Sequence, residues 1–381
     1  MRRIPVDSTP LARLSRRGLR AVAIGALALL VIAAAGLVYL RSTATTKEAT
    51  TRPSVDPMVV TSNPVTYDFV SATTGWAILG SVGQSRLFRT TDGARHWHSQ
   101  SPGGESSFPI SSSVLVQLFG PGDGFMAIGQ LSALHLYRTN DGGAHWASVQ
   151  VPDPQVEAVT FSDPTHGWMM AGTNSGSSSV YATTDGAMSW QRLSDSPIGA
   201  YGLSARGSAE IWSGSFGWTG PPRVSVSNDG GANWRDDQLP SPPTMSGDQV
   251  AASQWDTTIT SLPGVGLLAT ALCGCLPGGP FMFTSFDAGA TWTFVPPPPG
   301  LVGFQDDFHW WAITARMLYK SSDAGLTWTK VSNQLPDWQF VPYVLDSKHA
   351  WAELTVVGGH GLALTNDGGL HWSRADVPQS S

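Results

Sequence analysis

Cysteine and charge are both scarce in this sequence of 381 residues. There are only two cysteines, which excludes a fold held together by several disulfides. Charged residues make up 13%, and stretches rich in alanine, leucine, glutamate and lysine, typical of helical proteins, are missing beyond the N-terminal region. Glycine (42), proline (27) and tryptophan (16) are abundant instead. This composition is typical of many short strands joined by tight turns, with aromatic side chains packed between sheets.

Long apolar runs are also missing, with one exception at residues 19–40. At about 1.5 Å per residue this run is long enough to cross a hydrocarbon core of roughly 30 Å. The arginines before or at its start outnumber one acid, Asp7; they are Arg2, Arg3, Arg13, Arg16, Arg17 and Arg20. The positive-inside rule therefore predicts a cytoplasmic tail (1–18), a transmembrane anchor (19–40) and an extracytoplasmic remainder at the cell membrane. A cleaved signal peptide is the alternative, although its apolar region usually has only about 7–15 residues.

Basic residues are few beyond the anchor. Residues 41–57 form a polar, threonine-rich tether, and residues 58–381 form the folded domain. After residue 57 the chain has 13 basic and 25 acidic residues, a net charge of −12. Because no basic stripe exists to hold a phosphate backbone, nucleic-acid binding is not expected.

The dominant feature of the domain is an eight-residue pattern, S/T-x-D-x-G-x-x-W, the Asp box. It occurs seven times, with Ala94 and Ala187 in place of the glycine in two copies. Its aspartates are Asp92, Asp141, Asp185, Asp229, Asp287, Asp323 and Asp367, and its tryptophans are Trp97, Trp146, Trp190, Trp234, Trp292, Trp328 and Trp372. An aspartate in a hairpin turn accepts hydrogen bonds from nearby backbone amides, and glycine supplies the positive φ that such turns need. The tryptophan then enters the next strand and packs between neighbouring sheets. These residues are therefore interpreted as structural.

A second element, an apolar strand followed by Gly-Trp or a relative, precedes each box, as in Phe69…Gly75-Trp76 and Phe161…Gly167-Trp168. Successive box aspartates lie 36 to 58 residues apart. Repeats of roughly 40–50 residues are typical of four-stranded propeller blades. The sequence thus predicts an all-β fold, a single seven-bladed β-propeller with four-stranded antiparallel blades, preceded by one transmembrane helix. In the third blade the strands are expected at 156–162, 167–172 and 180–184, with the fourth starting near Trp190.

The strand order defines two faces. The box face carries the Asp boxes and the turns between strands one and two, and the variable face carries the loops between strands two and three and the crossings between blades. The longest departures from the repeat are expected on the variable face, at the crossing 235–261 and the loop 270–280. Since variable loops on a rigid ring are where sites are placed, this face is the expected binding surface. Its candidate residues are Trp218, Arg223, Trp255, Arg316, Trp338 and His360. The alternative for each tryptophan is that it packs its loop onto the ring.

Cys273 and Cys275 are separated by one glycine. Outside the membrane we expect a local, strained disulfide between them, with free thiols and then a metal site as the alternatives. No other histidine or cysteine lies close in sequence, and the nine histidines show no metal-binding spacing. Neither a metal nor a cofactor is therefore expected.

The full blade pattern, F-x-D-x₃-G-W followed by T-x-D-G-G-x-x-W, resembles the photosystem II stability/assembly factor family over residues 60–377, and sialidases more distantly. The resemblance implies a non-catalytic scaffold outside the cytoplasm that holds a membrane-protein client. One departure is that the family carries an arginine-rich patch, whereas this acidic domain has ten scattered arginines. A client other than the photosystem is therefore expected.

Two other function classes remain open. A sialidase-like enzyme or another exo-glycosidase needs convergent carboxylates, and sialidases add a tyrosine–glutamate pair. Only four glutamates follow residue 57, namely Glu105, Glu157, Glu210 and Glu353, and none is paired recognisably with a tyrosine. A surface receptor that binds a glycan or peptide at the variable face is the second alternative. The sequence favours the scaffold over both.

Overall fold

The computed structural model describes residues 65–378, with gaps at 82–83, 101–112, 121, 131–132, 154, 175–176, 274–279, 315, 334–341 and 357–358. The expected tail, anchor and tether lie outside the described residues, as do Trp338 and Cys275. In the part of the chain that the structure describes, no helix is long and apolar enough to cross a bilayer.

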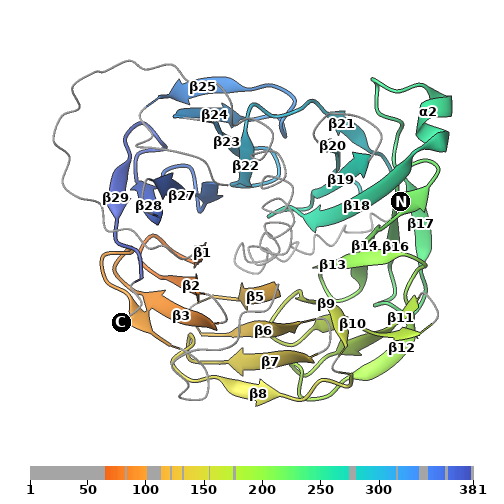
Figure 1. The fold of residues 1–381 in the computed structure, drawn as a ribbon, viewed down its shortest axis with the longest axis horizontal. Coiled ribbons are helices and arrows are strands. Elements are labelled where there is room, and N and C mark those ends of the chain that lie inside the picture. Colours follow the sequence, from red (N-terminus) through yellow and green to blue (C-terminus); the bar gives the residue numbers. More distant parts are fainter. Residues whose placement is uncertain are drawn as a thin grey trace, which may run out of the picture.

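Seven antiparallel sheets follow one another around a ring (Figure 1). Blades one to three comprise β1 (Val65–Phe69), β2 (Gly75–Ser81), β3 (Gln84–Thr90), β4 (His98–Ser99); β5 (Ser113–Leu118), β6 (Gly124–Gln130), β7 (Ala133–Thr139), β8 (Ala147–Val149); and β9 (Val156–Phe161), β10 (Gly167–Asn174), β11 (Ser177–Thr183), β12 (Gln191–Asp195). Blade four comprises β13 (Ala200–Arg206), β14 (Glu210–Ser215), β16 (Arg223–Ser227) and β17 (Arg235–Gln238). Blade five comprises β15 (Trp218–Thr219), β18 (Gln254–Ser261), β19 (Leu267–Cys273), β20 (Phe281–Ser285) and β21 (Thr293–Val295). Blades six and seven comprise β22 (Leu301–Phe304), β23 (Trp310–Thr314), β24 (Met317–Ser321), β25 (Thr329–Ser332); and β26 (Pro342–Val344), β27 (Ala350–Val356), β28 (Gly359–Thr365), β29 (Ser373–Ala375).

The predicted propeller is confirmed, with six four-stranded blades and one that gains a fifth strand. The first strand of each blade lies nearest the centre of the ring and the last lies at the rim (Figure 1). In blade five the extra strand β15 comes from the loop between β14 and β16 of blade four. It pairs with the inner edge of β18, with Trp218 opposite Trp255. Blades four and five are therefore joined by backbone pairing as well as by side chains.

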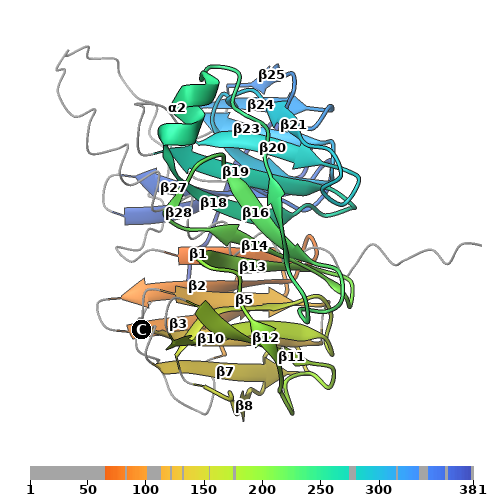
Figure 2. The same ribbon diagram turned by 90° about the vertical axis from the view of Figure 1, so that its right-hand side faces the viewer.

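Three segments expected as loops contain regular structure. The crossing 235–261 holds β17, the short helix α2 (Gly247–Ala252) and β18, and α2 lies on the variable face (Figure 2). The loop 270–280 begins as part of β19, and the loop that carries His360 begins β28 at Gly359. The strands in these segments were not predicted, because alternating small, polar and apolar residues give a weak two-residue periodicity.

The Gly-Trp element is explained by close packing inside a blade. A Cβ atom on Gly75 would lie 2.4 Å from the ring of Phe69, and one on Gly167 would lie 2.3 Å from the ring of Phe161. The ring from strand one therefore occupies the space that a side chain on strand two would fill. The tryptophan that follows faces the next blade, and the indole N–H of Trp168 donates to the carbonyl of Gly230 in the blade-four box at 2.9 Å.

The ring closes by side-chain packing, because in the described residues blades one and seven share no strand. The rings of Phe69 and Trp351 stack with centroids 3.8 Å apart. The hydroxyl of Tyr343 donates to Asp68 at 2.6 Å, and the indole N–H of Trp97 donates to the Asp376 carbonyl at 2.9 Å.

Candidate functional site

All seven Asp boxes share one hydrogen-bond network. In blade two, the Thr139 hydroxyl donates to Asp141 Oδ1 at 2.9 Å and accepts from the amide of Gly143 at 2.8 Å. Asp141 Oδ1 also accepts the amide of His145, and the His145 Nδ1 atom lies 2.6 Å from Asp141 Oδ2. The equivalent hydroxyl–aspartate bonds in all seven boxes measure 2.8–2.9 Å.

The seventh box position accepts only certain side chains, a restriction that is not apparent from the sequence. Its residue pairs its side chain with the second carboxylate oxygen in every box, through His96, His145, Ser189, Asn233, Thr291, Thr327 and His371. These residues differ in type, but each has a side chain that can donate a hydrogen bond. These hydrogen bonds lower the pKa of Asp141 and Asp229 to about 2, in Asp141 chiefly through the His145 amide and in Asp229 chiefly through the Asn233 side chain. The carboxylates are therefore charged at neutral pH, and each accepts hydrogen bonds that form the turn.

Six of the nine histidines are accounted for by turns of this kind. His96, His145 and His371 belong to boxes, and His166, His309 and His349 each place Nδ1 on an aspartate three residues earlier. In the described residues, no group of three or more histidine, cysteine, aspartate or glutamate side chains is arranged to hold a metal ion. Cys273 is disulfide-bonded at the end of β19.

The box tryptophans lie between blades. Trp292 packs edge-on against Trp212 of blade four with centroids 6.0 Å apart, and Trp372 packs on the blade-six core around Trp311. The boxes therefore hold the ring together.

On the variable face, apolar side chains gather at the junction of blades four and five. Ile198 lies in the crossing into blade four, and Phe216 in the loop after β14; they are 76% and 64% exposed. Tyr201 lies beside Phe216 with ring centroids 6.0 Å apart. We call these three residues and Trp218 the variable-face patch. Scattered single apolar residues are ordinary on a surface, whereas a contiguous exposed group marks an interaction site.

Arg223 holds the Trp218 side of this patch in place. Its guanidinium lies over the Trp218 ring, 3.3 Å from the centroid, and pairs with Asp236. It also donates to the Ile198 carbonyl at 3.3 Å. The loop itself is fixed to blade five, because Asp256 accepts the Gly217 amide at 2.8 Å. Burial, followed by the Asp256 carboxylate, raises the pKa of Tyr201, so the phenol is neutral.

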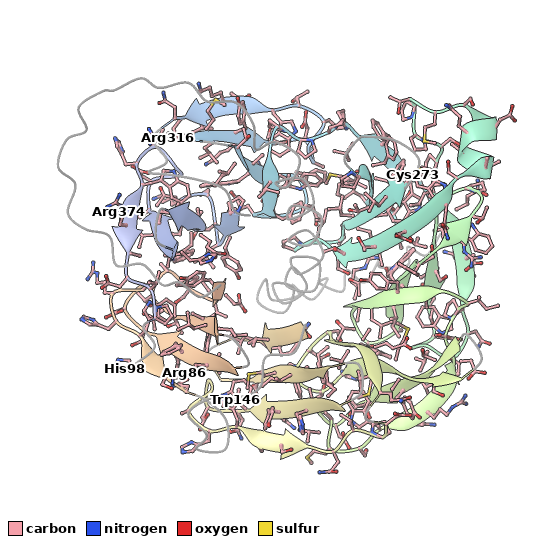
Figure 3. All side chains as sticks on the ribbon, in the orientation of Figure 1. Arg86, His98, Trp146, Cys273, Arg316 and Arg374 are labelled. Atoms are coloured by element: carbon pink, nitrogen blue, oxygen red, sulfur yellow. The ribbon has the colours of Figure 1, made fainter. Side chains whose placement is uncertain are left out.

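The structure thus brings two of the candidate residues together, Trp218 and Arg223. Trp255 is fully buried against Val250 and Phe281 in the blade-five core, which is the packing alternative for a tryptophan. Because the side chain is fully buried, neither face of its indole is open to a ligand. Arg316 is exposed in the turn between β23 and β24, on a separate part of the ring (Figure 3). Ile198, Tyr201 and Phe216 were missed, because an apolar residue in a loop has no sequence pattern that separates it from a core position.

His360 belongs to a third location, the junction of blades seven and one. Its Nδ1 atom lies 2.9 Å from Glu353 Oε1, and this hydrogen bond raises the His360 pKa. Tyr67 of β1 lies near Glu353; burial, and then the Glu353 charge, raise the pKa of its phenol well above its ordinary value. A nucleophilic tyrosine needs the opposite shift. The His360–Glu353 pair is a partly buried contact between two strands of blade seven.

The boxes and the closed ring define an Asp-box β-propeller. Residues 48–212 match the family model of the photosynthesis system II assembly factor YCF48, so the resemblance predicted from the blade pattern is confirmed.

Solved structures of similar fold include YCF48 bound to D1 peptide, at 16% identity and a TM-score of 0.50, covering 84% of this chain and 96% of that one. YCF48 from Cyanidioschyzon merolae shares 17% identity with a TM-score of 0.40, covering 83% and 95%. The GH74 xyloglucanase from Xanthomonas campestris shares 13% with a TM-score of 0.45, covering 81% and 60%. A search of curated proteins finds no significant match. At these identities the likeness to solved structures concerns the fold alone.

Proposed function

We propose that this chain is a membrane-anchored, extracytoplasmic scaffold that holds a protein client on its variable face without catalysis. The observation that carries the proposal is the variable-face patch, where Ile198, Phe216 and Tyr201 are exposed together. The similarity to YCF48, one structure of which holds a D1 peptide, supports a peptide or protein as the kind of ligand.

The patch suits an apolar segment of a client. Arg223 holds the Trp218 ring and Asp256 holds the backbone beside Phe216, so little conformational entropy of these parts is lost on binding. One side of the Trp218 indole is covered by the Arg223 guanidinium, and the residue is partly exposed. Aromatic anchors in a pre-formed surface contribute most of the free energy of many protein interfaces.

The proposed anchor at 19–40 would keep this surface near the membrane. Strand β1 starts on the variable face, at Val65, because the strand runs toward the turn that precedes β2 on the box face. The described part of the chain therefore begins on the side of the proposed client site.

Client binding is tested with the full-length chain in its native membrane, by cross-linking and identification of the attached proteins. We expect an Ile198→Ser/Phe216→Ser variant to lose the specific client, with affinity reduced about tenfold or more. Met188→Ser is the matched control, since Met188 is 74% exposed but lies in the blade-three box on the opposite face. Equal recovery of the client by wild type and double variant would contradict the proposed site. Turnover of a fluorogenic sialoside or a xyloglucan oligosaccharide would contradict the absence of catalysis.

Membrane topology is tested by adding protease to intact spheroplasts. We expect the propeller to be digested or released while residues 1–18 stay protected, and the intact chain to sediment with membranes after a high-salt wash. A soluble, shortened product lacking residues 1–40 would favour the cleaved signal peptide.

A further inference from the structure

The box face carries one feature that turn chemistry does not explain. Phe286 of the blade-five box and Phe308, in the turn before β23, are 36% and 48% exposed. Their rings stack with centroids 4.8 Å apart and an interplanar angle of 24°. Val265, in the turn between β18 and β19, is 60% exposed, and Phe286 packs over the neighbouring Gly266. These three residues, named the box-face patch, form one apolar surface across blades five and six.

The repeat provides an internal comparison for both phenylalanines. Phe286 occupies the second box position, which is polar in the other six boxes: Thr91, Asn140, Thr184, Asn228, Ser322 and Asn366. Phe308 precedes the histidine of an Asp-x-x-His turn, where the two equivalent residues are Thr165 and Lys348. The fold therefore does not require an aromatic side chain at either position. Two separate positions therefore carry phenylalanine where the equivalent residues of other blades are polar, and the two rings contact each other.

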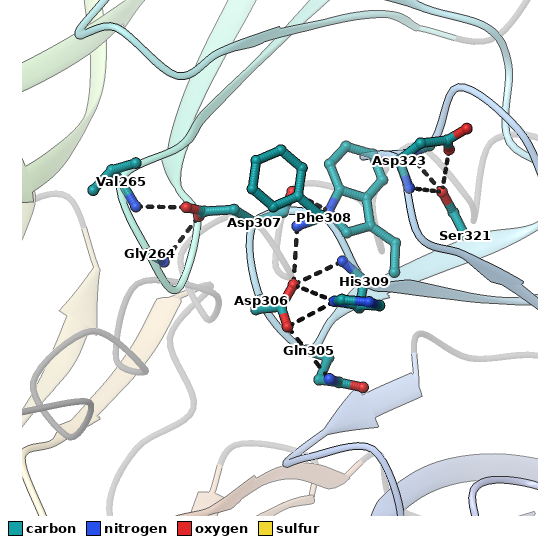
Figure 4. Close-up of polar contacts among 11 residues, drawn as sticks. Gly264, Val265, Gln305, Asp306, Asp307, Phe308, His309, Ser321 and Asp323 are labelled. Carbon is teal, nitrogen blue, oxygen red and sulfur yellow. Dashed lines mark hydrogen bonds and ion pairs between the residues drawn. The ribbon is translucent and has the colours of Figure 1, made fainter.

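The surface beneath the patch is rigid. Asp307 is buried, and its carboxylate accepts the amides of Gly264 at 2.9 Å and Val265 at 2.7 Å (Figure 4). The indole N–H of Trp310 donates to the Asp307 carbonyl at 3.0 Å, and Ala324 of the blade-six box donates to the Phe308 carbonyl at 3.0 Å. The two rings are therefore displayed from fixed turns.

The turns that carry the patch contain three carboxylates. Asp287 follows Phe286 in the chain, Asp306 lies two residues before Phe308, and Asp323 precedes Ala324, whose amide donates to the Phe308 carbonyl. The Thr291 hydroxyl and amide lower the pKa of Asp287. Partial burial acts the other way on Asp306 and Asp323, but the hydrogen bonds donated to each outweigh it, and the pKa of each is lowered.

One cation, Arg206 of β13, contacts the patch and is already paired. Arg206 forms an ion pair with Glu210 at 2.6 Å and donates to the Val265 carbonyl. The patch thus presents apolar rings inside an acidic rim.

We propose that the box-face patch is a second docking surface, for a protein segment whose apolar side chains are flanked by lysine or arginine. Apolar side chains on such a segment cover the Phe286–Phe308 pair, and its cations face the surrounding aspartates. Charge complementarity of this kind speeds encounter and selects partners, while the buried rings supply affinity. This surface lies on the face opposite the proposed client site, so one propeller would hold two segments at once.

The test uses the full-length chain in detergent and a labelled twelve-residue peptide containing two phenylalanines flanked by lysines. We expect binding that weakens as salt rises and that falls about tenfold or more in the Phe286→Asn/Phe308→Thr variant. Both substitutions introduce residues that other blades carry at these positions, so folding is preserved, and circular dichroism and the unfolding midpoint verify this.

Three controls make the outcome decisive. Met188→Ser and Ile198→Ser/Phe216→Ser should bind the peptide as wild type does, which separates this surface from the variable-face patch. A peptide with glutamates in place of the lysines should not bind. Equal binding by wild type and the Phe286→Asn/Phe308→Thr variant, or by both peptides, would overturn the proposal. Dimerisation of the wild-type chain in sedimentation experiments that this variant abolishes would instead assign the patch to a second copy.

Discussion

A single hydroxyl organises each Asp-box turn. In blade two the Thr139 hydroxyl donates to Asp141 and accepts from two backbone amides while it is itself buried. We expect Thr139→Val, which keeps the shape but leaves the Gly143 amide without its acceptor, to lower the free energy of unfolding by about 1–3 kcal/mol. Thr139→Ser retains the hydroxyl and should cost much less. Denaturant unfolding measures both, and a valine variant as stable as wild type would show that the hydroxyl does not hold the turn.

His360 illustrates how one ion pair links the stability of blade seven to pH. Its hydrogen bond to Glu353 raises the pKa of the imidazole in the folded state above its ordinary value of 6.5. The stabilisation is therefore fully present below about pH 6.5 and is lost as pH rises through the higher folded pKa. We expect Glu353→Gln to lower the His360 pKa and to remove this part of the pH dependence. NMR titration of the His360 ring checks the shift, and an unchanged titration in Glu353→Gln would contradict it.

At the scale of single elements, neighbouring inner strands approach closely because glycine allows it. A Cβ atom on Gly214 of β14 would lie 1.9 Å from the Thr257 carbonyl oxygen of β18. We expect Gly214→Ala to force the strands apart and to lower the free energy of unfolding by about 1–3 kcal/mol. Gly247→Ala, at the start of α2 where a Cβ meets no atom within 4 Å, is the matched control and should be neutral or slightly stabilising. Equal stability of the two variants would show that β14 can move away at no cost.

The strands and the site differ in how far the sequence predicts them. The blade-three strands begin within a few residues of the predicted positions, because box and Gly-Trp spacing fixes the turns on both sides. The extra strand β15 was missed, since its pairing with β18 depends on the neighbouring blade. Trp218 and Trp255 show the same limit for the site. They face each other in register, yet one is partly exposed under Arg223 and the other is fully buried. Local sequence does not distinguish them, because burial of both depends on tertiary packing.

At the scale of the whole molecule, the two docking proposals depend on a ring whose blades keep their relative positions. That ring closes without strand exchange among the described residues, so the junction of blades seven and one relies on the stack of Phe69 on Trp351 and on the Tyr343–Asp68 hydrogen bond. At the other junctions the chain also passes directly from one blade to the next, and β15 adds backbone pairing between blades four and five. The closing junction is therefore expected to be the one at which the ring opens first.

Trp351→Ala tests this closure. Removing a buried indole should lower the free energy of unfolding by about 3–5 kcal/mol and should expose blades one and seven before the others. Hydrogen exchange measured by mass spectrometry should show loss of protection in β1, β2, β27 and β28, while the blade-three strands keep theirs. Trp212→Ala removes an equally buried indole where the chain runs directly between blades, so it should lower stability without selective loss in blades one and seven. Uniform loss of protection around the ring in Trp351→Ala would mean that the propeller opens as one cooperative unit.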